Sequence, residues 1–143
     1  MFTIARQDYE TLVAHARAEY PNEACALLGG RDSTVERVYA LPNAEASPTF
    51  YMVEPNAQLH AMTEMDDLGL DLVGIFHSHT FTEAYPSRTD VELAAYEDAA
   101  YLILSLADPD APVLRAFRIR QGKVSEEPVN LVAGYDHLAG EPR

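Results

Sequence analysis

The sequence predicts a mixed α/β (α+β) protein, in which one β-sheet has helices packed against it. Stretches with helical spacing of apolar residues alternate with short apolar runs typical of buried strands, first around residues 7–20 and 24–30 and again around 55–68 and 72–76. The length of 143 residues suffices for one sizeable core but not for two comfortable ones. We therefore expect a single domain over residues 1–143, with residues from about 131 to 143 as a loosely ordered tail.

The first half of the chain is expected to contain two helices. Tyr9, Leu12 and Ala16 follow helical spacing, whereas His15 falls outside this stripe and is predicted to face solvent. His60, beside the stripe of the second helix, is predicted to lie at the surface. The expected elements are an edge strand at 2–4, a helix at 7–20, a hairpin of strands at 24–30 and 34–41, a short strand at 50–53 and a helix at 55–68 that stops at Gly69.

The second half is expected to be mainly strand. Residues 72–76 are continuously apolar, which indicates a strand covered on both faces. A helix is expected from Ser87 to about Tyr96, followed by strands at 100–107 and 113–120 and a short last strand that begins at Val124.

Charge and composition argue against several classes of function. Ten basic residues face 23 acidic ones, and the formal net charge of −13 would repel a phosphate backbone, so we expect no nucleic-acid partner. The longest apolar run, 99–107, is far shorter than the roughly 20 residues of a membrane span, and no basic leader precedes an apolar run. The single cysteine, Cys25, is expected to be a small buried residue. The sequence therefore predicts a soluble, cytoplasmic protein.

Two histidines follow the apolar strand at 72–76. On an extended strand His77 and His79 share a face, while Ser78 points the other way. With the carboxylate of Asp90 they would supply three ligands and leave one position open, the arrangement of a catalytic zinc. The pair alone is also consistent with a polar strand end, and Ser87-x-x-Asp90 also reads as the capping box of a helix. The two readings of Asp90 are compatible, because a cap would hold its carboxylate in a fixed orientation.

Glu23 stands at the mouth of the apolar strand at 24–30. A carboxylate in this place either faces solvent or has a partner, because its desolvation is costly. Beside a metal-bound water it could act as a general base and then as an acid, although spacing alone does not establish that proximity. Deaminase motifs and the His-Glu-x-x-His helix of other zinc enzymes are absent from the sequence.

Together, Glu23, His77-Ser78-His79 and Ser87-x-x-Asp90 resemble the motif of the JAMM metallopeptidases (MPN or Mov34 domains), and the resemblance covers nearly the whole chain. It implies one Zn²⁺ per chain, bound by His77, His79 and Asp90 with water as fourth ligand. It also implies that Glu23 is the general base and then acid, and that Ser87 stabilises the oxyanion. The implied fold is a curved mixed sheet flanked by helices, related to the cytidine-deaminase architecture.

The flanking stretches 43–51, 80–90 and 126–130 resemble one subgroup, the small bacterial Mec-like enzymes. This resemblance implies a ubiquitin-like sulfur-carrier protein with a C-terminal Gly-Gly as substrate and the release of cysteine in cysteine biosynthesis. The alternatives are an isopeptidase for another ubiquitin-like conjugate and a non-catalytic MPN scaffold. The loop at 80–86 is expected to border the substrate tail. The oligomeric state is left open between a monomer and a homodimer.

Overall fold

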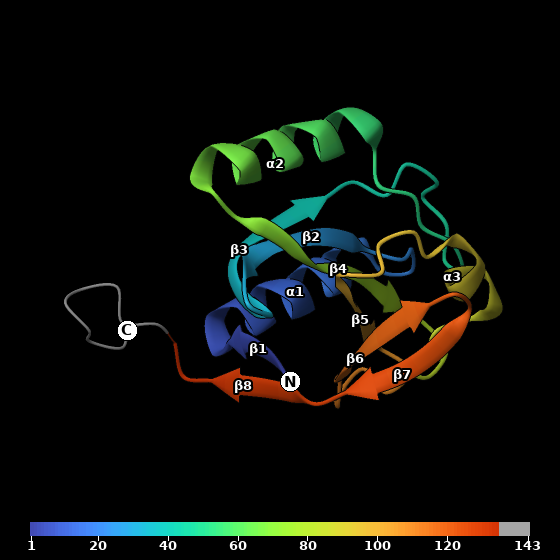
Figure 1. Ribbon diagram of the computed structural model, residues 1–143. Helices are drawn as coiled ribbons and strands as arrows, with labels where there is room; N and C mark the ends of the chain where they lie inside the picture. Colours follow the sequence, from blue (N-terminus) through green and yellow to red (C-terminus); the bar gives the residue numbers. More distant parts are fainter. Residues whose placement is uncertain (135–143) are drawn as a thin grey trace.

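The computed structural model describes residues 1–134, which form one eight-stranded sheet and three helices (Figure 1). The helices are α1 (Arg6–Glu19), α2 (Pro55–Leu68) and α3 (Arg88–Leu93). The strands are β1 (Phe2–Ala5), β2 (Cys25–Arg31), β3 (Thr34–Leu41), β4 (Asp71–His79), β5 (Ala100–Ser105), β6 (Val113–Arg120), β7 (Lys123–Glu127) and β8 (Val129–Val132). This arrangement confirms the predicted mixed α/β fold.

The sheet is mixed and strongly curved. Its strand order is β7-β6-β5-β4-β2-β3-β1-β8, with parallel pairing between β4 and β5, β1 and β3, and β1 and β8. Strands β7 and β8 stand at opposite ends of this order, yet only Pro128 separates them in the chain. The sheet must therefore curl until its two ends approach one another, and Figure 1 shows them meeting below α1.

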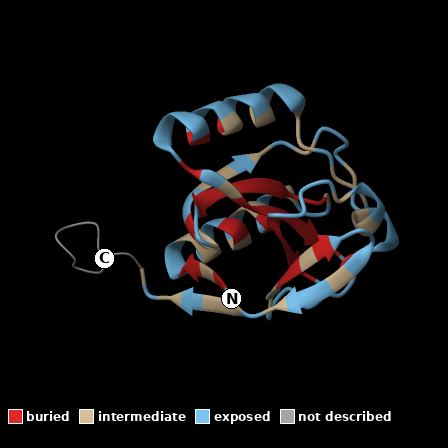
Figure 2. Cartoon of the chain, in the orientation of Figure 1, coloured by how far each residue is buried: buried red, intermediate tan, exposed pale blue. Residues whose placement is uncertain are grey.

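Each face of the sheet has its own helix, and α1 and α2 lie on opposite sides (Figure 1). Leu12 and Ala16 of α1 join the larger apolar cluster, to which the central strands contribute Leu28, Phe76 and Leu102. Ala61 and Met65 of α2 pack on the other face, against Leu27, Ile75 and Tyr101. The central strands are accordingly buried along most of their length, whereas the outer surface of α2 is exposed (Figure 2). No helix within residues 1–134 is long and apolar enough to cross a membrane.

Helix boundaries follow local sequence signals. Helix α2 starts at Pro55 as predicted, with the Glu54 carboxylate accepting hydrogen bonds from two amides of the first turn, and stops at Gly69, whose φ of 69° lies in the left-handed region. Ser87 caps α3 through both halves of a capping box with Asp90. This helix ends at Leu93 rather than at Tyr96.

Several sequence predictions differ from the structure at the sheet margins. Strand β1 is an interior strand between β3 and β8, not an edge. Residues 50–53 form no strand and take part only in an isolated bridge between Asn43 and Val53. Leu131 and Val132, assigned to the tail, belong to β8, whose pairing with β1 joins distant parts of the chain and so left no local signal. The remainder of the predicted tail, from residue 135, lies outside the described residues.

Gly30 is required at the irregularity in the hairpin of β2 and β3. A Cβ atom at this position would overlap the backbone carbonyl oxygen of Thr34, which cannot move without breaking the hairpin. We expect Gly30→Ala to lower the free energy of unfolding by on the order of 2–4 kcal/mol in urea denaturation. Gly29→Ala is the matched control, because the atoms nearest to its Cβ would belong to the side chains of Met65, at 3.2 Å, and Leu70, at 3.5 Å, and not to the backbone. Equal losses for the two variants would contradict this account.

Candidate metal centre

The pairing of β2 with β4 brings Glu23 and the histidines to the same end of the sheet. Cys25 is paired with His77 in this antiparallel ladder. Continuing the same register by two residues sets Glu23 level with His79. Residues directly opposite each other in an antiparallel pair place their side chains on one face, so the Glu23 side chain lies on the face that carries both histidines. The pairing of β2 with β4 thus brings together residues that are more than fifty positions apart in the sequence.

Ser78, between the histidines, secures this register. As predicted, strand alternation turns its side chain to the opposite face of the sheet. Its hydroxyl oxygen accepts a hydrogen bond from the Ala24 amide at 2.8 Å, and its own amide donates to the Ala24 carbonyl at 3.0 Å. The backbone next to Glu23 is therefore held at two points by the residue that separates the two histidines.

Asp90 reaches the histidines because Ser87 caps α3 and so places Asp90 in the first turn of that helix. The Asp90 carboxylate accepts a hydrogen bond from the Ser87 amide at 2.9 Å, while the Ser87 hydroxyl oxygen accepts one from the Asp90 amide at 3.0 Å. The same carboxylate oxygen, Oδ2, lies beside both imidazoles. The predicted capping box is therefore present, and it places the Asp90 carboxylate beside both histidines, where the predicted role as a metal ligand is geometrically possible.

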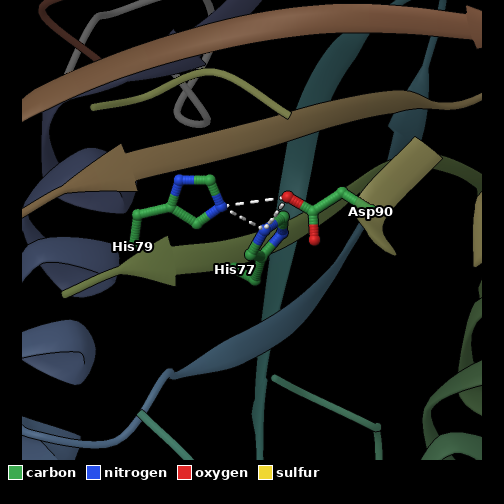
Figure 3. Close-up of side chains that lie close together, drawn as sticks. All are labelled: His77, His79 and Asp90. Atoms are coloured by element: carbon green, nitrogen blue, oxygen red, sulfur yellow. Dashed lines mark hydrogen bonds and ion pairs between the residues drawn. The ribbon is translucent and has the colours of Figure 1, made fainter. Parts of the chain in front are cut away.

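His77, His79 and Asp90, which we call the His-His-Asp group, form a compact triangle of donor atoms (Figure 3). The two Nε2 atoms are 3.2 Å apart, and they lie 3.1 Å and 2.9 Å from Asp90 Oδ2. Ligand atoms around a tetrahedral zinc ion, at bond lengths of roughly 2.0–2.1 Å, are about 3.3 Å apart. The group could therefore hold such an ion with small adjustments of its side chains.

The hydrogen bonds of the group also fit a bound cation. His79 Nδ1 lies 2.8 Å from the Glu83 carbonyl oxygen, which can only accept, so this nitrogen carries a proton. In the neutral ring, Nε2 then directs a lone pair at the Asp90 carboxylate, which is unfavourable unless a proton or a metal ion lies between them. Hydrogen bonding of a ligand histidine to a carbonyl through its other nitrogen is common in metal sites.

The pKa values of the group shift in opposite directions. Burial lowers the pKa of His77, against the effect of Asp90. Burial also opposes the charged form of His79, but hydrogen bonds to Asp90 and to the Glu83 carbonyl raise its pKa overall. Burial alone would raise the pKa of Asp90, but hydrogen bonds from both histidines hold it well below its usual range. The carboxylate thus stays ionised among the imidazoles, as a metal ligand requires.

Glu23 is nearly fully buried, with an exposed fraction of 5 %, and lies beside the group. It lines a cavity of about 160 Å³ together with His79 and Ser87. The pKa of its carboxyl is raised to about 8, chiefly by burial; the neighbouring His79 lowers the pKa and Asp90 contributes to raising it. Its Oε1 atom has no hydrogen-bond partner among the described residues. The structure therefore brings all five residues singled out from the sequence to one place.

Two further residues of the site were missed in the sequence. The Asn43 side-chain amide donates to the carbonyls of Glu23 and Phe50, each at 3.0 Å, and so ties the 42–54 loop to the site. The Tyr51 ring stacks on His77, with centroids 4.4 Å apart and an angle of 16° between the rings. An asparagine after Pro42 is a known organiser of loops and could have drawn attention to Asn43. Tyr51 gave no comparable signal.

His15 corrects a sequence prediction. It is half-buried rather than solvated, and its Nε2 lies 2.9 Å from the Cys25 carbonyl oxygen. The bond joins α1 to the first residue of β2, two residues after Glu23. His60, in contrast, is exposed as predicted.

Comparison with known proteins identifies the relatives of this chain. Residues 5–120 match the family described as prokaryotic homologs of the JAB domain. The CysO-cysteine peptidase of Mycobacterium tuberculosis is 49% identical over 126 residues, which cover 87% of this chain and 86% of that protein. A probable TtuB-protein conjugate cleaving protease of Thermus thermophilus is 37% identical over 111 residues, which cover 77% of this chain and 70% of the relative.

Solved structures share the fold. A protein of Desulfitobacterium hafniense superposes with a TM-score of 0.87 at 42% identity, covering 96% of this chain and 97% of its own. A JAB1/MPN domain protein of Archaeoglobus fulgidus gives a TM-score of 0.61 at 21% identity, with coverages of 92% and 99%, and so supports the fold alone.

The sequence matches, together with a His-His-Asp group that could hold a metal ion, define the class of protein as a metallopeptidase hydrolase. Within this class, the chain belongs to the JAMM/MPN family, as a member of its prokaryotic JAB branch. The resemblance inferred from the sequence motif is thus confirmed.

Stacking on Tyr51 should fix the orientation of His77. We expect Tyr51→Leu to weaken Zn²⁺ binding about 10-fold or more, because residues that orient ligands typically contribute on this scale. Tyr51→Phe keeps the ring and should bind Zn²⁺ like the wild type. Competition with a chromophoric chelator measures both affinities. The role assigned to the ring is refuted if Tyr51→Leu and wild type bind Zn²⁺ equally.

The raised pKa of Glu23 should appear in the stability of the metal-free protein. Because its folded pKa of about 8 lies above the ordinary value of 4.5, the stability that its proton provides is complete below pH 4.5 and is lost as pH rises through 8. Metal-free Glu23→Gln escapes this loss. Relative to wild type, its free energy of unfolding should grow by on the order of 2–4 kcal/mol between pH 5 and 9.

Urea denaturation across this pH range measures the difference. Glu45→Gln, which changes an exposed carboxylate in the neighbouring loop, is the control and should track the wild type. A constant difference between Glu23→Gln and wild type would mean that Glu23 is ionised at no cost in the folded protein.

Proposed function

We propose that this protein is a Zn²⁺-dependent hydrolase that cleaves the amide bond after the C-terminal glycine of a ubiquitin-like sulfur-carrier protein and releases cysteine. The observation that carries the proposal is the convergence of three ligand atoms within 3.2 Å of one another, next to a buried carboxyl with an unpaired oxygen. His77, His79 and Asp90 would hold one Zn²⁺ per chain.

A Zn²⁺ ion in this position would supply Lewis acidity to the scissile carbonyl and would acidify a water molecule. Glu23 would provide the proton transfers. Its unpaired Oε1 can take the proton of the attacking water and then pass it to the leaving amine nitrogen, which departs poorly as an anion. The products are the free carboxylate of the carrier and the free amine.

Ser87 would stabilise the oxyanion. Its hydroxyl oxygen is occupied in accepting the Asp90 amide, an arrangement that leaves the hydroxyl proton free for donation. The residue lines the same cavity as Glu23, where charge would develop on the carbonyl oxygen. A positioned donor of this kind stabilises the transition state more than the ground state.

The substrate assignment is supported by the relatives. The mycobacterial relative at 49% identity is named for a CysO–cysteine adduct, and the Thermus relative at 37% for a TtuB–protein conjugate. Both names describe cleavage of a conjugate, of CysO with cysteine in the first and of TtuB with a protein in the second. The higher identity and coverage favour the cysteine adduct.

Glu23→Gln should separate metal binding from catalysis. It keeps the shape of the side chain but removes the proton acceptor, so we expect Zn²⁺ binding within about 2-fold of wild type and a loss of at least about 10²-fold in the release of cysteine from CysO–cysteine. Mass spectrometry of the carrier follows the reaction. Glu45→Gln should cleave at the wild-type rate.

Near-wild-type turnover by Glu23→Gln would show that Glu23 is not the base. Failure of the Zn²⁺-loaded wild type to release cysteine, or any other amine, from a carrier adduct would refute the proposed function itself.

A further inference from the structure

Two cavities flank the His-His-Asp group and share no lining residue. The first, of about 160 Å³, contains Glu23, His79 and Ser87 and is completed by Pro48, Thr49, Thr80, Phe81 and Thr82; we call it the inner cavity. The second, of about 230 Å³, contains Asp90 and is completed by Phe50, Tyr51, Met52, Thr89 and Leu93; we call it the outer cavity. An amide substrate centred on the group has two arms, one for each cavity.

The position of Glu23 indicates which part of the substrate, the leaving amine or the carrier tail, would occupy each cavity. The amine must receive a proton as it leaves, and Glu23 lines only the inner cavity. On this ground the leaving amine would lie on the inner side and the carrier tail on the outer side. Met52 and Leu93, both about half exposed or more, would then offer apolar contact to the tail. This orientation would place residues 80–82 beside the leaving group, whereas the 80–86 loop was expected from the sequence to border the substrate tail, and that expectation stays a prediction.

The inner cavity has fixed walls. The Thr80 hydroxyl donates to the Pro48 carbonyl at 2.9 Å and so joins the two loops that form the cavity. The Ser105 hydroxyl donates to the Thr82 carbonyl at 2.6 Å. Thr80 itself is buried. A cavity braced in this way is preformed and cannot widen without losing these two hydrogen bonds, each donated by a buried hydroxyl-bearing residue.

The size of the inner cavity suits one small amino acid. Its volume of about 160 Å³ is smaller than that of the outer cavity and smaller than the ~300 Å³ at which ordinary ligand pockets begin. The hydroxyls of Thr49 and Thr82 in its wall can donate hydrogen bonds to a free carboxylate, whereas that of Thr80 is used in the bond to Pro48. Glu23 is the only acidic or basic side chain in the wall besides His79.

Phe81 forms the aromatic part of this wall. Its ring stands edge-on to Tyr20, with centroids 5.7 Å apart, although it is 60 % exposed. Tyr20 comes from the end of α1 and Phe81 from the loop after β4, so the contact braces the wall from a second element. A leaving group that is bulky or continues as a polypeptide would have to displace this ring.

We propose that the inner cavity is the subsite for the leaving group, and that Phe81 restricts it to a single small amino acid. The proposal rests on the proposed function and narrows its substrate to carrier adducts of free amino acids such as cysteine, and excludes efficient cleavage of carrier–protein conjugates.

The test uses CysO, the carrier named for the mycobacterial relative, in four forms: bearing C-terminal Cys, Ser or Trp, or Cys followed by a folded polypeptide. For the Zn²⁺-loaded wild type we expect kcat/KM for the Cys and Ser forms to agree within about 10-fold, and the Trp and polypeptide forms to be slower by about 100-fold or more, as expected of a site that closes against larger groups. Phe81→Ala should raise the Trp/Cys ratio of kcat/KM at least about 10-fold.

Leu93→Ala is the matched control, because it removes an exposed apolar side chain from the outer cavity. Leu93→Ala should change kcat/KM for all four substrate forms by the same factor and leave the Trp/Cys ratio of kcat/KM unchanged. Binding gives a second readout that does not need turnover. In the Glu23→Gln background, the Trp form should bind more weakly than the Cys form, and adding Phe81→Ala should remove the difference.

Equal cleavage of all four forms by the wild type, or an unchanged Trp/Cys ratio in Phe81→Ala, would overturn the subsite while leaving the proposed function in place. If Leu93→Ala shifted the Trp/Cys ratio and Phe81→Ala did not, the leaving group would lie in the outer cavity, and the proposed subsite would be wrong. Absence of cleavage of every form would refute both proposals.

Discussion

The antiparallel register of β2 against β4 is the constraint on which the site depends. A shift by one residue would turn Glu23 to the opposite face of the sheet, away from the histidines. Ser78 opposes such a shift, because its hydroxyl and amide hold the backbone of Ala24. The parallel partner β5 adds a second restraint, because its Ser105 pairs with His79. The Ser105 hydroxyl also donates a hydrogen bond to the Thr82 carbonyl in the loop that follows β4. The two histidines are thus placed by a buried strand, and Glu23 lies two residues before the strand that pairs with it.

The ligand triangle is unfavourable for the polypeptide alone. Two largely buried imidazoles and a carboxylate point at one another within 3.2 Å, and only protons can offset their repulsion when no cation is bound. His77 Nδ1 has no hydrogen-bond partner among the described residues, so the ring gains its orientation from Tyr51 instead. The rest of the fold tolerates this arrangement because apolar packing on both faces of the sheet holds β4 in place. A bound metal ion would offset the repulsion between these ligand atoms in the folded protein.

Periodicity predicted the parts of the fold that carry strong local signals. Pro55 and Gly69 bounded α2, and the apolar run into His77 predicted β4. It missed β8 and the interior position of β1, because these strands are defined by pairing between the two ends of the described chain. The same holds for the site. The sequence motif singled out His77, His79, Asp90, Glu23 and Ser87, whereas Asn43 and Tyr51 were missed because they lie in a loop with no regular structure. Spacing along the chain cannot show which loop side chains fold back onto a ligand.

That irregular loop gives the site its asymmetry. Between Pro42 and Glu54 the chain passes over the histidine face, and Asn43 fixes it by bonds to Glu23, Phe50 and Met52. Its early part, at Pro48 and Thr49, lines the inner cavity, and its later part, from Phe50 to Met52, lines the outer one. One loop therefore separates the two arms of a substrate. Because Asn43 bonds to the backbone of Glu23, the position of the base and the division between the cavities are set together. A change of specificity by mutation can consequently leave the chemistry intact only where it avoids Asn43, which favours the side chains at the far walls, such as Phe81 and Leu93.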